Sequence, residues 1–345
     1  MTKQIMVGTV PVGGGAPVSI QSMCNTRTDD VRATVEQIRR LCAAGCQIIR
    51  VAVPDMAAAR AVGAIKEQID IPLVVDIHFD YKLALEAVAA GADKVRINPG
   101  NIGGEDRVKA VADACRRRGI PIRIGVNGGS LEKSLLAKYG GVCPEAMVES
   151  AFGHIRLLNQ FDFDDICVSL KSSSVPMTMQ AYQLMRQRSD YPLHIGVTEA
   201  GTVRMGTLKS AVGIGGLLAL GVGDTMRVSL SADPIEEVYA ARDILKAAGV
   251  RKDGPELVSC PTCGRTRIDL IGLAAQVEQR LKQVEKPITV AVMGCVVNGP
   301  GEASAADCGI AGGQGEGLLF RKGEIIKKVP QEQLVDELFA LIDTL

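Results

Sequence analysis

Apolar and polar positions alternate in a regular order from Val18 to about Gly249. Short β-branched runs are each followed by a longer stretch with apolar residues at helical spacing, which is typical of βαβ units and a parallel sheet. Two of these stretches, DDVRATVEQIRRLCAAG and DYKLALEAVAAG, end in a glycine that suits a left-handed helix cap. The pattern predicts eight strands, at 18–23, 47–53, 72–78, 94–99, 121–126, 165–171, 193–198 and 225–230.

Eight β/α units in about 230 residues favour a (β/α)8 TIM-type barrel, whose usual size is roughly 250 residues. A doubly wound open sheet is the alternative, although it does not usually need eight such regular repeats. After the barrel, RKDGPE is a polar Gly/Pro segment typical of a linker. We therefore expect a barrel over residues 1–250, a linker over 251–256 and a smaller α+β domain over 257–345.

The smaller domain contains a CxxC pair, a helical pattern over 267–282 and an apolar strand, ITVAVMGC. A Gly-rich stretch, a hairpin-like segment, GLLFRKGEIIKKV, and a final helix follow.

Composition and charge exclude several classes of protein. The hydrophobic and charged fractions, 47% and 23%, are close to the globular average, which excludes a disordered, collagenous or coiled-coil chain. Lys plus Arg and Asp plus Glu both number 39, and Trp is absent, so neither charge nor stacking favours nucleic acid or an anionic membrane surface. We also expect no membrane-spanning helix and, since MTKQIMVGTV lacks a signal-type apolar run, a cytoplasmic location.

Ten cysteines in a reducing compartment are more often packing residues or metal ligands than disulfides. Cys260 and Cys263 form a CxxC pair, and Cys295 ends the apolar strand. A zinc ribbon needs a second CxxC, and a thioredoxin-like pair needs a preceding strand within a βαβ unit. Three thiolates and one further ligand suit an iron–sulfur cluster. The remaining cysteines, at 24, 42, 46, 115, 143 and 167, lack ligand spacing, so we expect them to be packing residues.

Two residues after Cys295 can supply the fourth ligand, Glu302 and Cys308, and spacing alone does not separate them. A fourth thiolate makes a closed site suited to electron transfer. A carboxylate is more readily displaced, and would leave one iron able to accept a substrate oxygen.

Cations lie inside the predicted barrel strands, where a buried charge is costly unless it is paired or faces a ligand. The period of two puts Arg96 with Asn98, Arg123 with Asn127, and Arg227 with Ser229 and Ser231 on common strand faces that run towards the carboxyl ends. The NGGS segment at 127–130 can add backbone N–H donors. These features predict a site for a phosphorylated substrate. The cations are Arg50, Arg96, Arg123, Lys171 and Arg227.

The alternative is that these cations form structural ion pairs with Asp76, Asp93, Glu199 or Asp224. Glu199 is the best single carboxylate for acid/base chemistry, although it is as well suited to pair with a cation. His78, which shares a strand face with Asp76, is expected to be structural.

The motifs occur in one order over nearly the whole chain: IQSMCNTRT, VVDIHFDY, RINPGNIG, RIGVNGGSLEK, GVTEAG, RVSLSADP, CPTCGR and GCVVNGPGEA. This combination closely resembles the bacterial 4-hydroxy-3-methylbut-2-enyl diphosphate synthase family of the non-mevalonate isoprenoid pathway. The resemblance implies a barrel followed by a 4Fe-4S domain, assembled as a head-to-tail homodimer. It also implies the two-electron reductive ring opening of 2-C-methyl-D-erythritol 2,4-cyclodiphosphate, with flavodoxin or ferredoxin as electron donor.

Carried over by motif, the resemblance makes the three cysteines and Glu302 the cluster ligands, Glu302 being exchangeable. It assigns the diphosphate to the five cations with Asn127 and Ser229, places Glu199 near the reacting carbon, and places Asn298 beside cluster and substrate. Cys308 departs from this pattern. A contrasting hypothesis is a phosphate-binding barrel lyase or isomerase whose second domain holds a structural zinc ion.

Overall fold

Eight parallel strands form the first sheet of the computed structural model, which describes residues 1–252, 254–295 and 303–345. Their order is β8-β7-β6-β5-β4-β3-β10-β9, and a bridge between Val168 and Leu193 joins the two ends of this order, so the sheet closes into a barrel. The predicted TIM-type barrel is confirmed, and the open-sheet alternative is wrong. The strands are β3 (Ser19–Met23), β4 (Ile48–Ala52), β5 (Leu73–Asp76), β6 (Lys94–Ile97), β7 (Ile122–Asn127), β8 (Ile166–Lys171), β9 (His194–Ile195) and β10 (Thr225–Met226).

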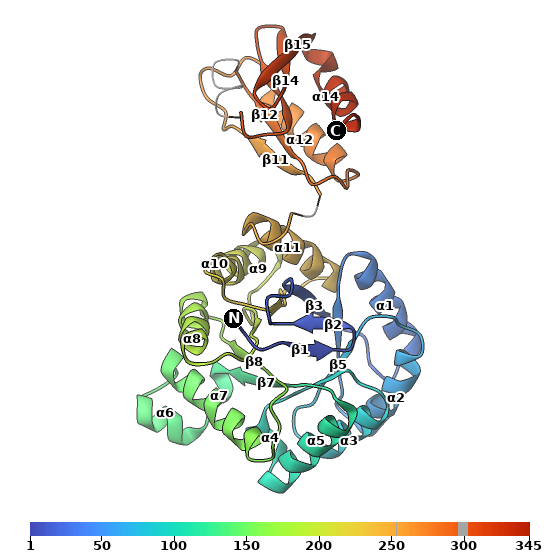
Figure 1. Cartoon of the computed structure of the whole chain (residues 1–345), viewed down its shortest axis with the longest axis vertical. Helices are drawn as coiled ribbons and strands as arrows, with labels where there is room; N and C mark the ends of the chain where they lie inside the picture. The colour runs from blue at the N-terminus through green and yellow to red at the C-terminus, as the bar shows by residue number, and fades with distance from the viewer. Residues whose placement is uncertain (253, 296–302) are drawn as a thin grey trace. The chain divides into compact units, whose positions relative to one another are not determined.

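Helices surround the barrel (Figure 1). Several begin at a side chain that accepts a hydrogen bond from the first helical turn, such as Asp30 before α1 and Asp55 before α2. Their apolar faces pack on the strands in one large core. The helices are α1 (Val31–Ala43), α2 (Met56–Lys66), α3 (Tyr81–Ala89), α4 (Pro99–Ile102), α5 (Glu105–Arg118), α6 (Lys133–Tyr139), α7 (Pro144–Asn159), α8 (Val175–Arg188), α9 (Val203–Ser210), α10 (Gly216–Ala219) and α11 (Pro234–Ala247).

The last two barrel strands are much shorter than predicted. β9 and β10 have two residues each. Directly after β9 a glycine is needed, since a Cβ on Gly196 would lie 2.7 Å from the carbonyl oxygen of Arg227 and 2.9 Å from Lys171 Nζ.

A β-hairpin that the sequence analysis did not predict covers the amino-terminal end of the barrel. Strands β1 (Ile5–Val7) and β2 (Val10–Val12) pair antiparallel, and Figure 1 shows them lying across the ring of strands. The apolar side chains of the hairpin are buried against Ile48, Val74 and Cys167 of the barrel strands.

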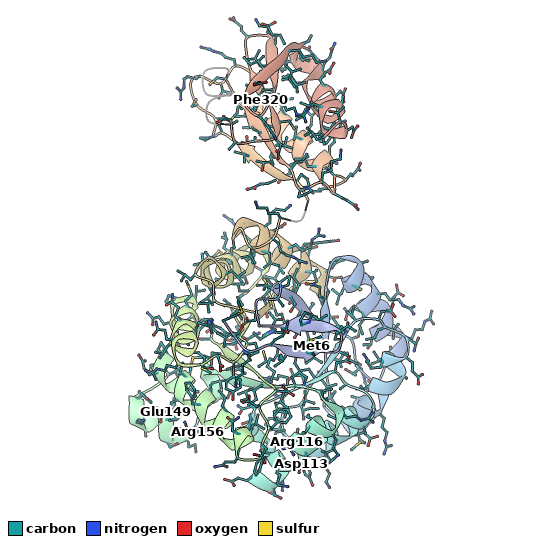
Figure 2. The ribbon with its side chains drawn as sticks, in the orientation of Figure 1. Met6, Asp113, Arg116, Glu149, Arg156 and Phe320 are labelled. Carbon is teal, nitrogen blue, oxygen red and sulfur yellow. The ribbon has the colours of Figure 1, made fainter. Side chains whose placement is uncertain are left out.

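The chain divides into two compact units, Met1–Val250 and Arg251–Leu345. The second unit is a five-stranded sheet in the order β11-β12-β13-β14-β15, parallel over the first three strands and antiparallel over the rest. Its elements are β11 (Glu256–Ser259), α12 (Leu270–Leu281), β12 (Thr289–Met293), β13 (Cys308–Gly312), β14 (Glu316–Arg321), β15 (Glu324–Pro330) and α14 (Leu334–Asp343). Phe320 on β14, labelled in Figure 2, is fully buried in this unit.

Two strands of the second unit, β11 and β13, were not predicted, and β11 begins inside the expected linker. Because β11, α12 and β12 form a βαβ unit, the CxxC pair does follow a strand, and that argument against a thioredoxin-like pair was wrong. In the described ranges of the chain, no helix has the length and apolar character needed to cross a membrane.

Candidate active site

Five cations lie together inside the barrel, four of them on strands and Arg227 directly after β10. The side chains of Arg50, Arg96 and Lys171 are each about 8% exposed and Arg123 is 1% exposed, while Arg227 is partly buried. Arg96 and Arg123 are register partners on adjacent strands, and Lys171 is the partner of Asn127. The chain therefore gathers these side chains as expected, although their role in binding is still a prediction.

The electrostatics of Lys171 show how close the five groups are. Burial lowers the pKa of this amine well below its ordinary value, and Arg123, Arg227, Arg50 and Arg96 each lower it further. Burial also lowers the pKa of Arg123 to about 10, with Arg96 the largest contribution from a neighbouring charge. Like charges held this close favour the uptake of an anion.

Two carboxylates neutralise part of this charge. Asp76 Oδ1 accepts a hydrogen bond from Arg96 Nη1 at 2.9 Å, and its Oδ2 lies 3.7 Å from Arg50 Nε. Burial alone would raise the pKa of Asp76, but Arg50 and Arg96 outweigh it and lower the pKa to about 2. The second carboxylate, Glu237 of α11, lies 3.5 Å from Arg227 Nη2.

The structural ion-pair alternative is therefore correct for Asp76 and does not hold for the other three acids. Asp93 binds Lys66, and Asp224 accepts hydrogen bonds from Thr2 and the Leu193 backbone. Glu199 is exposed.

Glu237 was missed by the sequence analysis because it comes from a helix, and no strand pattern marks it. The five predicted cations, together with the buried Lys94 that the prediction missed, thus face two carboxylates in the described part of the barrel, which suits a multiply charged anion.

A glycine makes room for one of the arginines. A Cβ at Gly125 of β7 would lie 2.4 Å from Arg96 Nε, so the guanidinium packs directly on the glycine backbone. Any larger residue at this position must displace the Arg96 head group.

Glu199 lies in the loop after β9 with a φ of 52°, a left-handed conformation that costs a non-glycine residue of order 1–3 kcal/mol. Strain of this kind is often found at functional sites. The same loop is tied to its neighbours, since Thr198 N–H donates to Ser172 O and Ser231 N–H donates to Gly201 O. Ser229, in the loop after β10, is partly buried.

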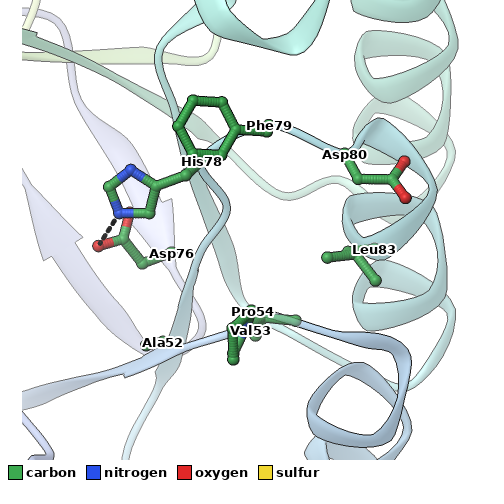
Figure 3. Close-up of a pocket in the computed structure, with 8 residues that line it drawn as sticks. All are labelled: Ala52, Val53, Pro54, Asp76, His78, Phe79, Asp80 and Leu83. Atoms are coloured by element: carbon green, nitrogen blue, oxygen red, sulfur yellow. Dashed lines mark ion pairs between the residues drawn. The ribbon is translucent and has the colours of Figure 1, made fainter.

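A cavity of about 270 Å³ opens beside the cations, between the carboxyl ends of β4 and β5 (Figure 3). One wall is apolar, with Val53, Pro54 and Leu83, and the other contains Asp76 and His78. His78 Nε2 lies 3.8 Å from Asp76 Oδ2, and the imidazole is 56% exposed. His78 therefore extends the site outward from the buried carboxylate rather than packing in the core.

In the second unit, the predicted ligands follow the ends of two neighbouring parallel strands. Cys260 comes directly after β11, and Cys295 comes two residues after the end of β12, so both lie at one edge of the sheet. Cys260 Sγ accepts a hydrogen bond from Gly294 N–H at 3.2 Å. The exposed Cys263 has a lowered pKa, chiefly because the Arg265 backbone N–H and side chain hydrogen-bond its sulfur.

Cys308, the alternative fourth ligand, lies at the other end of the sheet. It is the first residue of β13 and pairs with Val290 of β12. Val290 is three residues before Met293, the last residue of β12, so Cys308 lies about 10 Å along the strand direction from the end where Cys295 follows. Its side chain is fully buried in the apolar core, and burial raises the pKa of its thiol to about 11. These features fit a packing residue. Asn298 and Glu302 lie outside the described residues.

The three thiols fit a soft metal centre in kind, and Cys260 and Cys295 also in position, at the ends of neighbouring strands. As they stand, no three His, Cys, Asp or Glu side chains within 1–252, 254–295 and 303–345 are grouped closely enough to hold a metal ion. All ten cysteines are free thiols, so the three predicted ligands are available.

A (β/α)8 barrel with a buried cluster of cations, followed by an α+β unit with thiols at a sheet edge, defines a two-domain barrel enzyme. The chain belongs to the GcpE family: the family models for the GcpE TIM-barrel domain and the GcpE protein C-terminal domain match residues 2–242 and 256–344.

Curated relatives are similar over their whole length. The chain is 62% identical over 342 residues to the 4-hydroxy-3-methylbut-2-en-1-yl diphosphate synthase (flavodoxin) of Geobacter sulfurreducens, covering 99% of this chain and 97% of the relative. It is 59% identical over 344 residues to the protein of the same name from Clostridium perfringens, covering 100% and 99%.

Among solved structures, the dihydropteroate synthases of Yersinia pestis and Stenotrophomonas maltophilia are similar with TM-scores of 0.52. They are 14% and 15% identical and cover 73% and 71% of this chain, and 100% and 97% of their own. At this identity the likeness shows the barrel fold alone.

Proposed function

We propose that this enzyme catalyses the two-electron reductive ring opening of 2-C-methyl-D-erythritol 2,4-cyclodiphosphate to 4-hydroxy-3-methylbut-2-enyl diphosphate. One observation carries the proposal: Lys171 is buried among four arginines, while two carboxylates neutralise them in the described barrel. A substrate with two linked phosphates supplies the missing negative charge, and guanidinium groups bind phosphate oxygens in bidentate geometry. The names of the curated relatives support the same product.

In this proposal the barrel binds and orients the substrate. Arg50, Arg96, Arg123, Lys171 and Arg227 hold the diphosphate with Asn127 and Ser229. Glu199, on its strained loop, lies near the reacting carbon of the substrate, where its carboxyl group holds or delivers a proton. Because Arg50 and Arg96 are already held by Asp76, and Arg227 by Glu237, these three need little reorganisation on binding.

Cys260, Cys263 and Cys295 would hold a 4Fe-4S cluster, with Glu302 as the fourth, exchangeable ligand and Asn298 nearby. Such a cluster supplies the two electrons, one at a time. The word flavodoxin in the relatives' names supports a flavodoxin, or a ferredoxin, as the electron donor. The proposal includes a head-to-tail homodimer and a cytoplasmic location, which suits the free thiols.

The test begins with metal analysis of anaerobically purified protein. We expect about four irons and four sulfides per chain, and turnover of the cyclic diphosphate only with a reductant. Glu302→Ala should keep most of the iron and lose turnover. Zinc near one per chain without sulfide, and activity without reductant, would instead support the barrel lyase or isomerase with a structural zinc domain.

A further inference from the structure

The loop after β7 begins beside the cations. Asn127, the last residue of β7, is the register partner of Lys171, and Gly128–Ser130 form a 3-10 turn directly after it. Backbone N–H groups of such a turn bind an anion only if the loop is held in place. The loop ends at Glu132, the residue before α6.

Glu132 attaches this loop to α7. Its Oε1 accepts a hydrogen bond from Ser150 Oγ at 3.1 Å and lies 3.2 Å from His154 Nε2. Ser150 and His154 are 3% and 7% exposed, and their spacing of four places both on one face of the helix. The carboxylate is therefore held against the helix by two buried groups, and this contact fixes the far end of the loop.

The same imidazole contacts the loop after β6. A Cβ on Gly100 would lie 3.2 Å from His154 Cε1, and Gly100 N–H donates to Asn98 Oδ1 at 3.1 Å. Burial lowers the pKa of His154 while Glu132 raises it, and the net shift is downward, so the ring is neutral near pH 7. A neutral ring acts on Glu132 through its N–H and on Gly100 through packing.

A second link joins α6 to α7 further along. Lys138 Nζ lies 2.8 and 2.7 Å from the two carboxylate oxygens of Glu149, which Figure 2 labels on α7. This pair is largely exposed, and exposed pairs contribute little. The buried contacts of Glu132 are therefore the main fixed point of the loop.

We propose that His154 is a positioning residue for the anion site: through Glu132 and Gly100 it holds the loops after β7 and β6 in the arrangement that receives the diphosphate. The proposal rests on the proposed function, because it assumes that the cations and the Asn127–Ser130 loop bind this group. In this proposal His154 does not itself contact the substrate.

The test compares two substitutions at this position in the full-length protein with its cluster. His154→Leu removes the N–H donor, and His154→Gln keeps an N–H at the place of Nε2. Arg156→Gln, an exposed change two residues further along α7, is the matched control. The measurements are the dissociation constant of inorganic pyrophosphate by calorimetry, the KM and kcat for the cyclic diphosphate, and the melting temperature.

We expect His154→Leu to raise the pyrophosphate dissociation constant and the KM about tenfold, the effect of one lost hydrogen bond to a charged group, with kcat within about twofold. His154→Gln and Arg156→Gln should stay within about twofold of the parent. If His154→Leu does not fold, Ser150→Ala is the variant that tests the positioning role, since it removes the other hydrogen-bond donor to Glu132. We expect Ser150→Ala to bind pyrophosphate about threefold more weakly than the parent.

Arg123→Met separates this proposal from the proposed function. If pyrophosphate binds equally well to Arg123→Met, the assigned anion site is wrong. If Arg123→Met loses binding while His154→Leu, or Ser150→Ala in its place, binds like the parent, the positioning role is overturned. A lower melting temperature with unchanged affinity would also overturn it, because the imidazole would then serve packing only.

Discussion

Anion binding to the barrel should be coupled to proton uptake at Lys171. Its amine is buried among four arginines, and its pKa lies well below the ordinary value because of burial and then of these charges. A bound dianion reverses this effect, since a nearby negative charge favours the ammonium form. In the pH range between the lowered pKa of the free site and the higher pKa of the occupied one, binding therefore takes up as much as one proton per chain, and the affinity falls by up to about tenfold per pH unit as pH rises.

Sulfate is a suitable probe, because it does not titrate in this range. Calorimetric titrations near pH 8 in two buffers of different ionisation enthalpy give the number of protons taken up from the difference in binding enthalpy. Lys171→Met should remove this buffer dependence. Lys94 is a second candidate, since burial lowers its pKa to about 8, so Lys94→Met should be measured beside it.

The reasoning would be refuted if sulfate bound to the parent with the same enthalpy in both buffers and the same affinity across this pH range. Lys171 would then be fully charged among the four arginines without an anion, and the crowding of like charges would not be what draws the ligand into the barrel.

Three further outcomes are expected. Gly125→Ala should weaken pyrophosphate binding at least tenfold, by displacing the guanidinium that packs on it, whereas Gly153→Ala, on α7 and with open space around it, should not. Burial strongly lowers the pKa of His194, so as pH falls below about 6.5 this histidine binds a proton in the unfolded chain but not in the folded one. Between pH 7 and pH 5 the free energy of unfolding, measured by denaturant titration, should therefore fall by up to about 2 kcal/mol more in the parent than in His194→Gln. Cys260→Ala should lose iron and acid-labile sulfide, and Cys308→Ala should keep both while melting at a lower temperature.

The barrel could be predicted because each strand has its own apolar pattern. The missed elements lack one: β11 is a four-residue, mostly exposed edge strand, and β13 contains Gly309, whose Cβ would lie 2.5 Å from Ala291 O and from the Phe320 ring. Pairing with β12 makes both of them strands. No local pattern reports such pairing, so their residues resembled a linker and a Gly-rich loop.

The cations of the candidate site could be placed from strand parity, because in a parallel barrel all strands point the same way. Asp76 could be named as a partner from the same strand pattern, but the other contacts of the site could not. Glu237, Ser150 and His154 come from helices, and Glu132 from a loop, so only the packing of α7 and α11 on the barrel brings them to the site. The place of Cys308, at the opposite end of the sheet from Cys260 and Cys295, likewise depends on the direction of β13, which no local pattern reports.

The hairpin of β1 and β2 determines which end of the barrel a ligand can enter and leave by. Its buried contacts with Ile48, Val74 and Cys167 seal the amino-terminal end with apolar side chains. A charged ligand cannot pass that way, so the carboxyl end is both entrance and exit. Product must leave before the next substrate enters, and a product that retains the diphosphate competes directly with it. Accumulated product should therefore slow the enzyme as a competitive inhibitor.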